Sequence, residues 1–109
     1  MKAVVMDRAG GPEVLQCVEL PDSVAAPGQV LVKVAAAGVN FMDIGVRQGH
    51  IWTEMPYPKT LGVEGAGRVV AVGEGVEDMQ VGQRVAWVYS PGSYADIVVV
   101  PATFVVPSA

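Results

Sequence analysis

The chain has 109 residues, of which 51% are hydrophobic and 17% charged, and its net charge is −4. This composition is typical of one globular domain and excludes a disordered chain, and the absence of a basic cluster argues against nucleic-acid binding. With a single cysteine, Cys17, and a single histidine, His50, the chain has neither a disulfide framework nor a zinc site of the Cys/His type.

The chain offers no obvious targeting segment. Its first residues lack the apolar length of a signal peptide, because Asp7 and Arg8 interrupt them. No apolar run approaches the roughly 18 residues of a membrane-spanning helix. We therefore expect a soluble, cytoplasmic domain that does not bind membranes.

The first third of the chain reads as three strands. Residues 2–6, 15–20 and 30–37 are rich in valine and leucine, and the third run alternates with the period of a strand. Glycine and proline mark turns at residues 10–12 and 26–29. This order predicts an antiparallel meander.

A short helix is predicted at residues 41–48. Asn40 is a preferred N-cap residue, Asp43 is placed to return a capping-box hydrogen bond, and Gly49 suits the position after the helix. Gly45 costs about 1 kcal/mol in a helix interior relative to alanine. It indicates either close approach of another group or a weakly formed helix.

A proline-stiffened loop is predicted at residues 50–59. It contains two large aromatic side chains, Trp52 and Tyr57, which suit either a cap over the core or the wall of a pocket.

Residues 60–73 begin as a glycine-rich stretch and continue as a valine-rich strand. Glu64 is the single carboxylate among Gly62, Gly65 and Gly67, which indicates a glycine-rich turn carrying either a functional carboxylate or a buried hydrogen-bonding hub. In the second case, backbone N–H groups, Arg47 or Arg68 would satisfy it. The pattern does not favour a dinucleotide-binding fingerprint, because that motif requires a helix after the glycines and a valine-rich run follows them here.

Three further strands are predicted, at residues 85–89, 94–100 and 104–107. Many short strands separated by turn residues, with one short helix, indicate a mostly-β barrel or partly closed sheet.

Several motifs together resemble the medium-chain dehydrogenase/reductase superfamily and, within it, the zinc-free quinone oxidoreductases. They are AAAGVNFMD at residues 35–43, LGVEGAG at 61–67, VGQRV at 81–85 and GSYAD at 92–96. The resemblance covers essentially the whole chain. It implies a GroES-like, partly open β-barrel with one or two short helices over residues 1–109, with the Rossmann cofactor domain outside this chain.

The same resemblance implies metal-free chemistry. Zinc members of the superfamily carry a cysteine where this chain has Asn40 and a histidine where it has Val63. An amide and a valine do not replace those ligands. The implied reaction is hydride transfer from NADPH to a quinone or an enone, by an enzyme that is a homodimer when full length.

The resemblance also assigns residues to the site. Asn40, Phe41, Val63 and Glu64 are expected beside the cofactor, and Met42, Gly45, Trp52 and Tyr57 beside the substrate. Asn40 is expected to bond a cofactor or substrate oxygen, or to act as a plain N-cap, or both. Many quinone reductases have a tyrosine where this chain has Gly45, which implies a wider pocket.

Two other readings remain open at this point. One is a stand-alone GroES-like binding module, and the other is the domain of an enoyl-thioester reductase. Only a domain that packs on a partner cofactor domain is expected to expose an apolar face near Asn40 and Glu64.

Overall fold

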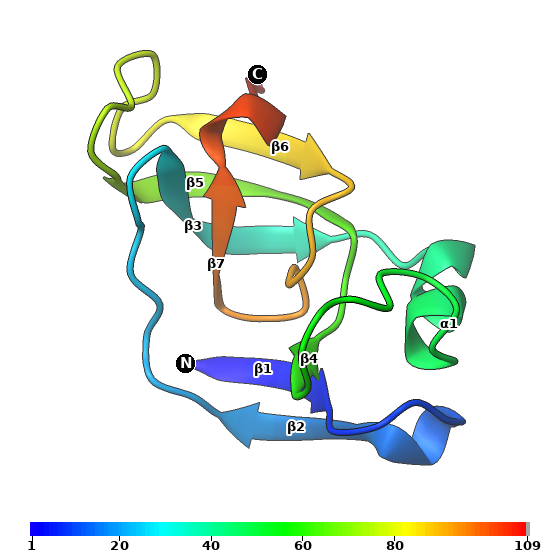
Figure 1. Ribbon diagram of the computed structural model, residues 1–109. Helices are drawn as coiled ribbons and strands as arrows, with labels where there is room; N and C mark the ends of the chain where they lie inside the picture. The colour runs from blue at the N-terminus through cyan, green and yellow to red at the C-terminus, as the bar shows by residue number, and fades with distance from the viewer. Residues whose placement is uncertain (109) are drawn as a thin grey trace.

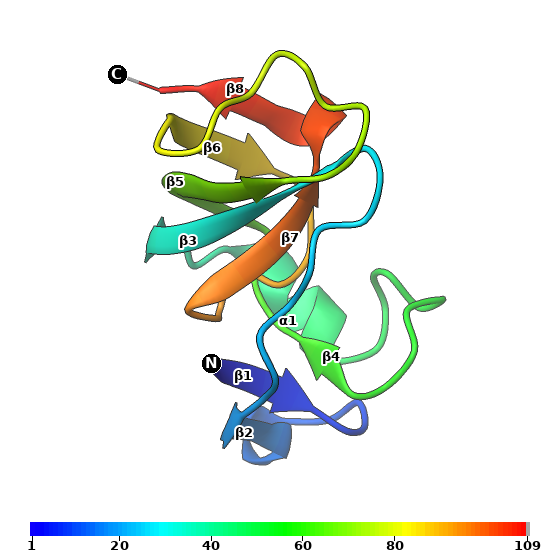
Figure 2. The same cartoon turned by 90° about the vertical axis from the view of Figure 1, so that its left-hand side faces the viewer.

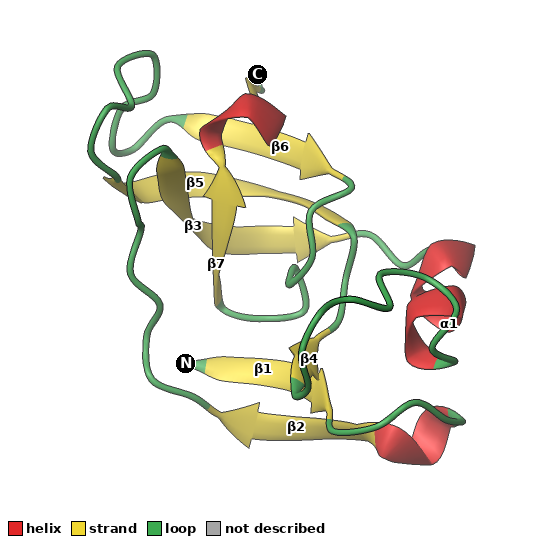
Figure 3. Cartoon of the chain, viewed as in Figure 1, coloured by secondary structure: helices red, strands yellow, loops and turns green. Residues whose placement is uncertain are grey.

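The computed structural model describes residues 1–108 as two antiparallel sheets with one α-helix beside them (Figure 1). The elements are β1 (Lys2–Met6), η1 (Pro12–Val14), β2 (Leu15–Glu19), β3 (Gln29–Ala37), α1 (Phe41–Arg47), β4 (Lys59–Thr60), β5 (Glu64–Val72), β6 (Arg84–Val88), β7 (Ile97–Pro101), η2 (Ala102–Phe104) and β8 (Val105–Pro107). The mostly-β fold with short helical segments is confirmed, as the colouring by secondary structure shows (Figure 3).

The strands form a three-stranded sheet in the order β2-β1-β4 and a five-stranded sheet in the order β7-β3-β5-β6-β8. In the turned view the larger sheet lies above the smaller one, with α1 at the level between them (Figure 2). The loop that follows α1 returns the chain to the small sheet through β4, which pairs with β1.

The predicted antiparallel meander of the first three strands is wrong. β1 pairs with β2, but β3 leaves them and pairs with β5 and β7 in the other sheet. Val30 and Val32 are completely buried on the inner face of β3. Alternation fixes that buried face but not the partner strand, because any strand with a matching apolar face can bury it.

The predicted glycine-rich turn around Glu64 is also wrong, because β5 already begins at Glu64. Gly65 and Gly67 lie inside the strand, where a Cβ on Gly65 would come within 2.7 Å of the Trp87 ring and one on Gly67 would meet the carbonyl of Lys33. The glycines therefore permit close approach of β3 and β6 instead of a turn.

Smaller differences concern strand ends. The predicted loop at residues 50–59 ends in β4, and the strand predicted at 94–100 begins only at Ile97, after an isolated bridge between Ala95 and Ala3. Tyr89, predicted to end β6, lies outside that strand.

Two apolar clusters hold the fold. The larger fills the five-stranded sheet and includes Val32, Val69, Val85, Trp87 and Val100. The smaller packs α1 against the three-stranded sheet and the segments beside it, through Met6, Val14, Val46 and Leu61. In residues 1–108, no helix has the length and apolar character needed to cross a bilayer.

Candidate functional site

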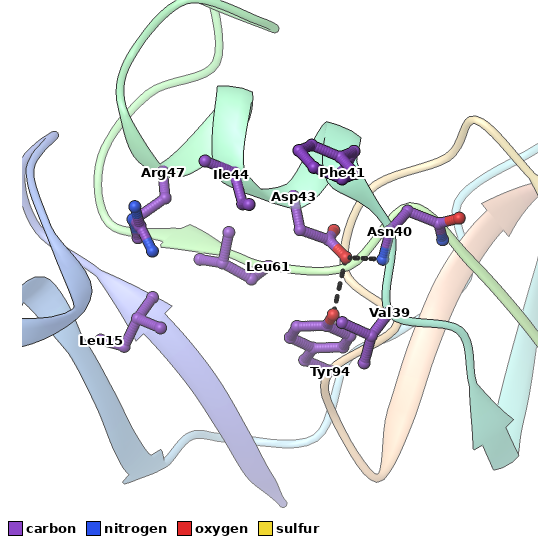
Figure 4. Close-up of a pocket in the computed structure, with 9 residues that line it drawn as sticks. All are labelled: Leu15, Val39, Asn40, Phe41, Asp43, Ile44, Arg47, Leu61 and Tyr94. Carbon is purple, nitrogen blue, oxygen red and sulfur yellow. Dashed lines mark hydrogen bonds between the residues drawn. The ribbon is translucent and has the colours of Figure 1, made fainter.

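The start of α1 is fixed by Asp43. Asn40 is extended, with φ −131° and ψ 157°, and its backbone N–H donates to Asp43 Oδ2 at 2.8 Å. The Asn40 carbonyl in turn accepts the Asp43 N–H at 3.0 Å. The predicted capping role of Asp43 is confirmed. In Figure 4 the Asn40 carboxamide points away from the Asp43 carboxylate, and its Nδ2 has no hydrogen-bond partner within residues 1–108.

Tyr94 reaches the same carboxylate from a segment 51 positions away in the chain. Its hydroxyl donates to Asp43 Oδ2 at 2.7 Å. Burial, followed by the hydrogen bond and the charge of Asp43, raises the pKa of Tyr94 well above its ordinary value of 10.0, so the hydroxyl stays protonated at neutral pH. Asp43 is itself buried, with its second oxygen unpartnered among residues 1–108.

One pocket, of about 290 Å³, lies where the start of α1 meets the start of β5 and the end of β6. We call it the amide pocket. It is lined by Asn40, Phe41, Met42, Val63, Glu64, Val88 and Tyr89. The structure thus brings together all four residues expected beside the cofactor and one of the four expected beside the substrate.

Besides the Tyr89 hydroxyl, the amide pocket contains two polar side chains that bind no other side chain in the described residues. Asn40 Nδ2 is buried without a hydrogen-bond partner in the described part of the chain. Glu64 is half-buried and pairs with neither arginine that was considered for it, since Arg47 donates to the Gly10 carbonyl and Arg68 to the Gly82 carbonyl. The amide pocket therefore offers an unused donor and a carboxylate.

Tyr89 lies at the rim of the amide pocket with a left-handed backbone. Its φ is 59°, which is uncommon for a residue other than glycine, and 67% of its surface is exposed. Such strained positions persist where the surrounding structure enforces them and often occur at binding sites. Tyr89 and Val88 were missed from the sequence, where they read only as the end of a strand.

A second pocket, of about 500 Å³, adjoins the amide pocket at Asn40 and Phe41, and Figure 4 shows its lining residues. We call it the arginine pocket. Its apolar walls come from Leu15, Val39, Phe41, Ile44 and Leu61, and its polar residues are Asn40, Asp43, Arg47 and Tyr94. The two pockets share Asn40 and Phe41.

Comparison with known proteins places this architecture in a family. Residues 26–109 match the alcohol dehydrogenase GroES-like domain. The chain belongs to that family. It is 38% identical to the human synaptic vesicle membrane protein VAT-1 homolog over all of its own length and 29% of the relative's. It is 42% identical to the quinone oxidoreductase of Salmonella typhimurium over 81% of the chain and 27% of that protein.

Solved structures agree. The Escherichia coli quinone oxidoreductase complexed with NADPH superposes with a TM-score of 0.91 at 32% identity, over 98% of this chain and 33% of that one. The resemblance to the medium-chain dehydrogenase/reductase superfamily and the GroES-like fold are therefore confirmed. The chain spans about a third or less of the length of these relatives.

Three of the residues expected beside the substrate lie elsewhere in this GroES-like domain. A Cβ on Gly45 would meet Ile51, so the glycine reflects close approach of the loop to α1. Trp52 packs against the smaller core cluster, as the core-cap interpretation proposed. Tyr57 is 44% exposed, and its ring centroid lies 4.5 Å from Nζ of buried Lys59. None of the three lines either pocket.

The GroES-like domain exposes an apolar face around the pockets. Phe41 is 90% exposed, Val39 85% and Val88 50%, and Tyr89 adjoins them. This confirms the apolar face predicted near Asn40 and Glu64, which a domain packed on a partner would cover. Residues 1–108 contain no group of three histidine, cysteine, aspartate or glutamate side chains placed to hold a metal ion.

Proposed function

We propose that this domain forms the substrate-side wall of a reductase that transfers a hydride from NADPH to a quinone or an enone without zinc. The observation that carries the proposal is the amide pocket, in which Asn40, Val63 and Glu64 come together beside an exposed apolar rim. Similarity to quinone oxidoreductases, one of them solved with NADPH, supports the same reading.

The residues of the amide pocket fit the nicotinamide end of NADPH. Met42 and buried Val63 offer apolar surface to a flat ring, and the orphaned Asn40 Nδ2 needs an acceptor such as a carbonyl oxygen. Asn40, Met42 and Val63 would hold that end of the cofactor. When bound, NADPH supplies the hydride.

The side chains of this domain then orient the reactants and exclude water. Asn40 donates to an oxygen of the cofactor or the acceptor, and it keeps its place because Asp43 and Tyr94 fix the backbone at the start of α1. Phe41, Val88 and Tyr89 remove water from the site once a cofactor domain covers them.

The side chains of the amide pocket also suit chemistry without zinc. They include one amide and one carboxylate, and Val63 contributes only an alkyl group. Zinc sites in proteins are built mainly from thiolate and imidazole ligands, which this pocket does not supply.

The experiment measures NADPH oxidation by the full-length polypeptide that carries this domain, with a naphthoquinone, methyl vinyl ketone or crotonyl thioester as acceptor. We expect turnover with the quinone or the ketone and none with the 109-residue chain alone. Turnover confined to the thioester would move the assignment to an enoyl-thioester reductase. No turnover with any acceptor would contradict the proposal and favour a binding module.

We further propose that the full-length enzyme is a cytoplasmic homodimer. Its mass in solution, measured by light scattering, tests the dimer, and fractionation of the source cell tests the location.

A further inference from the structure

The arginine pocket contains an unpaired cation. The Arg47 side chain is half-buried among the apolar walls of the pocket. No carboxylate in the described residues forms an ion pair with it. Because a guanidinium in apolar surroundings is stabilised by a hydrogen-bonded anion, this arrangement leaves an anion position open.

Arg47 is held in place by the loop that follows β1. Its Nε donates to the Gly10 carbonyl at 3.1 Å, and the Gly10 N–H donates to the Arg47 carbonyl at 3.0 Å. This reciprocal pair fixes the side chain and leaves both Nη groups without a protein acceptor in residues 1–108. The guanidinium is therefore oriented before any ligand arrives, which lowers the entropy cost of binding.

The obvious internal partner is engaged elsewhere. Asp43 lies four residues before Arg47 on α1, a spacing at which aspartate and arginine commonly pair. Instead, Asp43 Oδ2 accepts hydrogen bonds from Tyr94 and Asn40. Figure 4 shows Ile44 between Asp43 and Arg47, with Leu61 across the pocket. The Asp43 carboxylate thus binds groups at the start of the helix, and the Arg47 guanidinium is left without an anionic partner in the described residues.

We propose that Arg47 binds the anionic group of the electron acceptor, so that the substrate class is a small enone or quinone carrying a carboxylate or a similar anion. The inference has two parts: that Arg47 binds an anion, and that this anion belongs to the electron acceptor. The second, catalytic part rests on the proposed function. Asn40, shared by both pockets, lies seven residues before Arg47, which is about 10 Å along the helix axis at the usual rise per residue. The acceptor's apolar middle then lies against Ile44 and Leu61, with its reactive end near Asn40.

The binding half is tested on the 109-residue chain without cofactor. β-Acetylacrylate, an enone with a carboxylate, and its neutral methyl ester are titrated while NMR follows Arg47 Nε–Hε and the methyl groups of Ile44 and Leu61. We expect saturable shifts with the acid and at least tenfold weaker binding of the ester. Equal binding of acid and ester, or shifts that avoid Arg47, would overturn the inference.

Two variants sharpen this test. Arg47→Met is expected to abolish the preference for the acid. Arg68→Met is the matched control, because Arg68 also donates to a backbone carbonyl, that of Gly82, but lies outside the pocket. A preference that survives Arg47→Met in a folded protein would assign the anion to another group. If Arg47→Met does not fold, the comparison of acid and ester binding to the unaltered chain still tests whether the pocket binds an anion.

The catalytic half uses the full-length polypeptide. We expect kcat/KM to be at least tenfold higher for the acid than for the ester. In Arg47→Met this difference should disappear, because KM for the acid rises while kcat stays unchanged. Equal kcat/KM for both acceptors would overturn the assignment of the substrate class while leaving the reductase intact. If neither acceptor nor any quinone is reduced, the proposed function fails, and the NMR titration still reports on the anion site alone.

Discussion

The Tyr94 hydroxyl donates to Asp43 Oδ2 at 2.7 Å and so ties the segment before β7 to the first turn of α1. The same oxygen accepts the Asn40 N–H at 2.8 Å. Two parts of the chain that are distant in sequence thereby fix one asparagine at the boundary between two pockets. Hydrogen bonds to a charged, buried acceptor are among the stronger ones in proteins.

Removing the hydroxyl should therefore loosen the start of α1. We expect Tyr94→Phe to lower the free energy of unfolding by about 1–3 kcal/mol, because it takes away a partner of a buried carboxylate. Urea unfolding measures the change. Tyr89→Phe is the matched control, since Tyr89 is 67% exposed and its hydroxyl makes no hydrogen bond within residues 1–108. Equal losses in both variants would contradict the role of the Tyr94–Asp43 bond.

The raised pKa of Tyr94 predicts a loss of stability in alkali. The unfolded chain ionises this tyrosine near its ordinary pKa of 10.0, whereas the folded chain holds the proton to higher pH. The unfolded state thus binds fewer protons above pH 10.0, and stability falls as pH rises from there towards the folded pKa. The free energy of unfolding, measured across this range, should fall more steeply in the unaltered chain than in Tyr94→Phe. Parallel curves would contradict the expectation.

Gly45 should respond to its neighbour Ile51. A Cβ at Gly45 would meet Ile51 Cδ1, which limits any gain from replacing glycine within a helix. An added Cβ would also come within 3.0 Å of Ile51 Cγ1, so the matched background is Ile51→Ala, which removes both atoms. In that background Gly45→Ala should stabilise the domain by up to about 1 kcal/mol through helix propensity. In the unaltered background the same change should be neutral or destabilising. A double-mutant cycle by thermal unfolding measures the coupling, and independent, additive effects would contradict the contact.

The exposed apolar face should contribute little to the domain's own stability. Phe41 is 90% exposed, so Phe41→Ser should change the free energy of unfolding of the 109-residue chain by no more than about 0.5 kcal/mol. We propose that a cofactor domain covers this face in the full-length polypeptide, and in that case the same change should lower its melting temperature. Calorimetry of both proteins makes the comparison. An unchanged melting temperature in the full-length polypeptide would indicate that the face is free.

Sequence reasoning located most strands and the helix but not their partners. The valines of β1, β3 and β5 and the Asn40–Asp43 spacing carry local signals that a single sequence reveals. The partners of β3, by contrast, follow from which apolar faces meet across long sequence separations. The turn predicted at Gly65 and Gly67 was wrong for a related reason. These glycines allow close contact with Trp87 and Lys33 on neighbouring strands, which a single sequence does not reveal.

At the site, too, some residues could be predicted from the sequence and others only from the fold. Asn40, Phe41, Val63 and Glu64 were grouped by resemblance, and they share the amide pocket. Tyr94 and Tyr89 were missed, because only the fold reveals that one reaches Asp43 and that the other adopts a left-handed backbone at the rim. The tyrosine of the quoted GSYAD motif was the one available signal, and nothing in its spacing tied it to Asp43.

The central claim is that Asn40 acts on the reactants from the amide pocket. The most direct measurement is kcat/KM for quinone reduction by the full-length polypeptide with Asn40→Leu, beside Gln80→Leu as a control at an exposed position outside both pockets. We predict a fall of about 100-fold for Asn40→Leu, as for the loss of one positioned hydrogen-bond donor, and no change for Gln80→Leu. A folded Asn40→Leu variant with the unaltered rate would contradict the account.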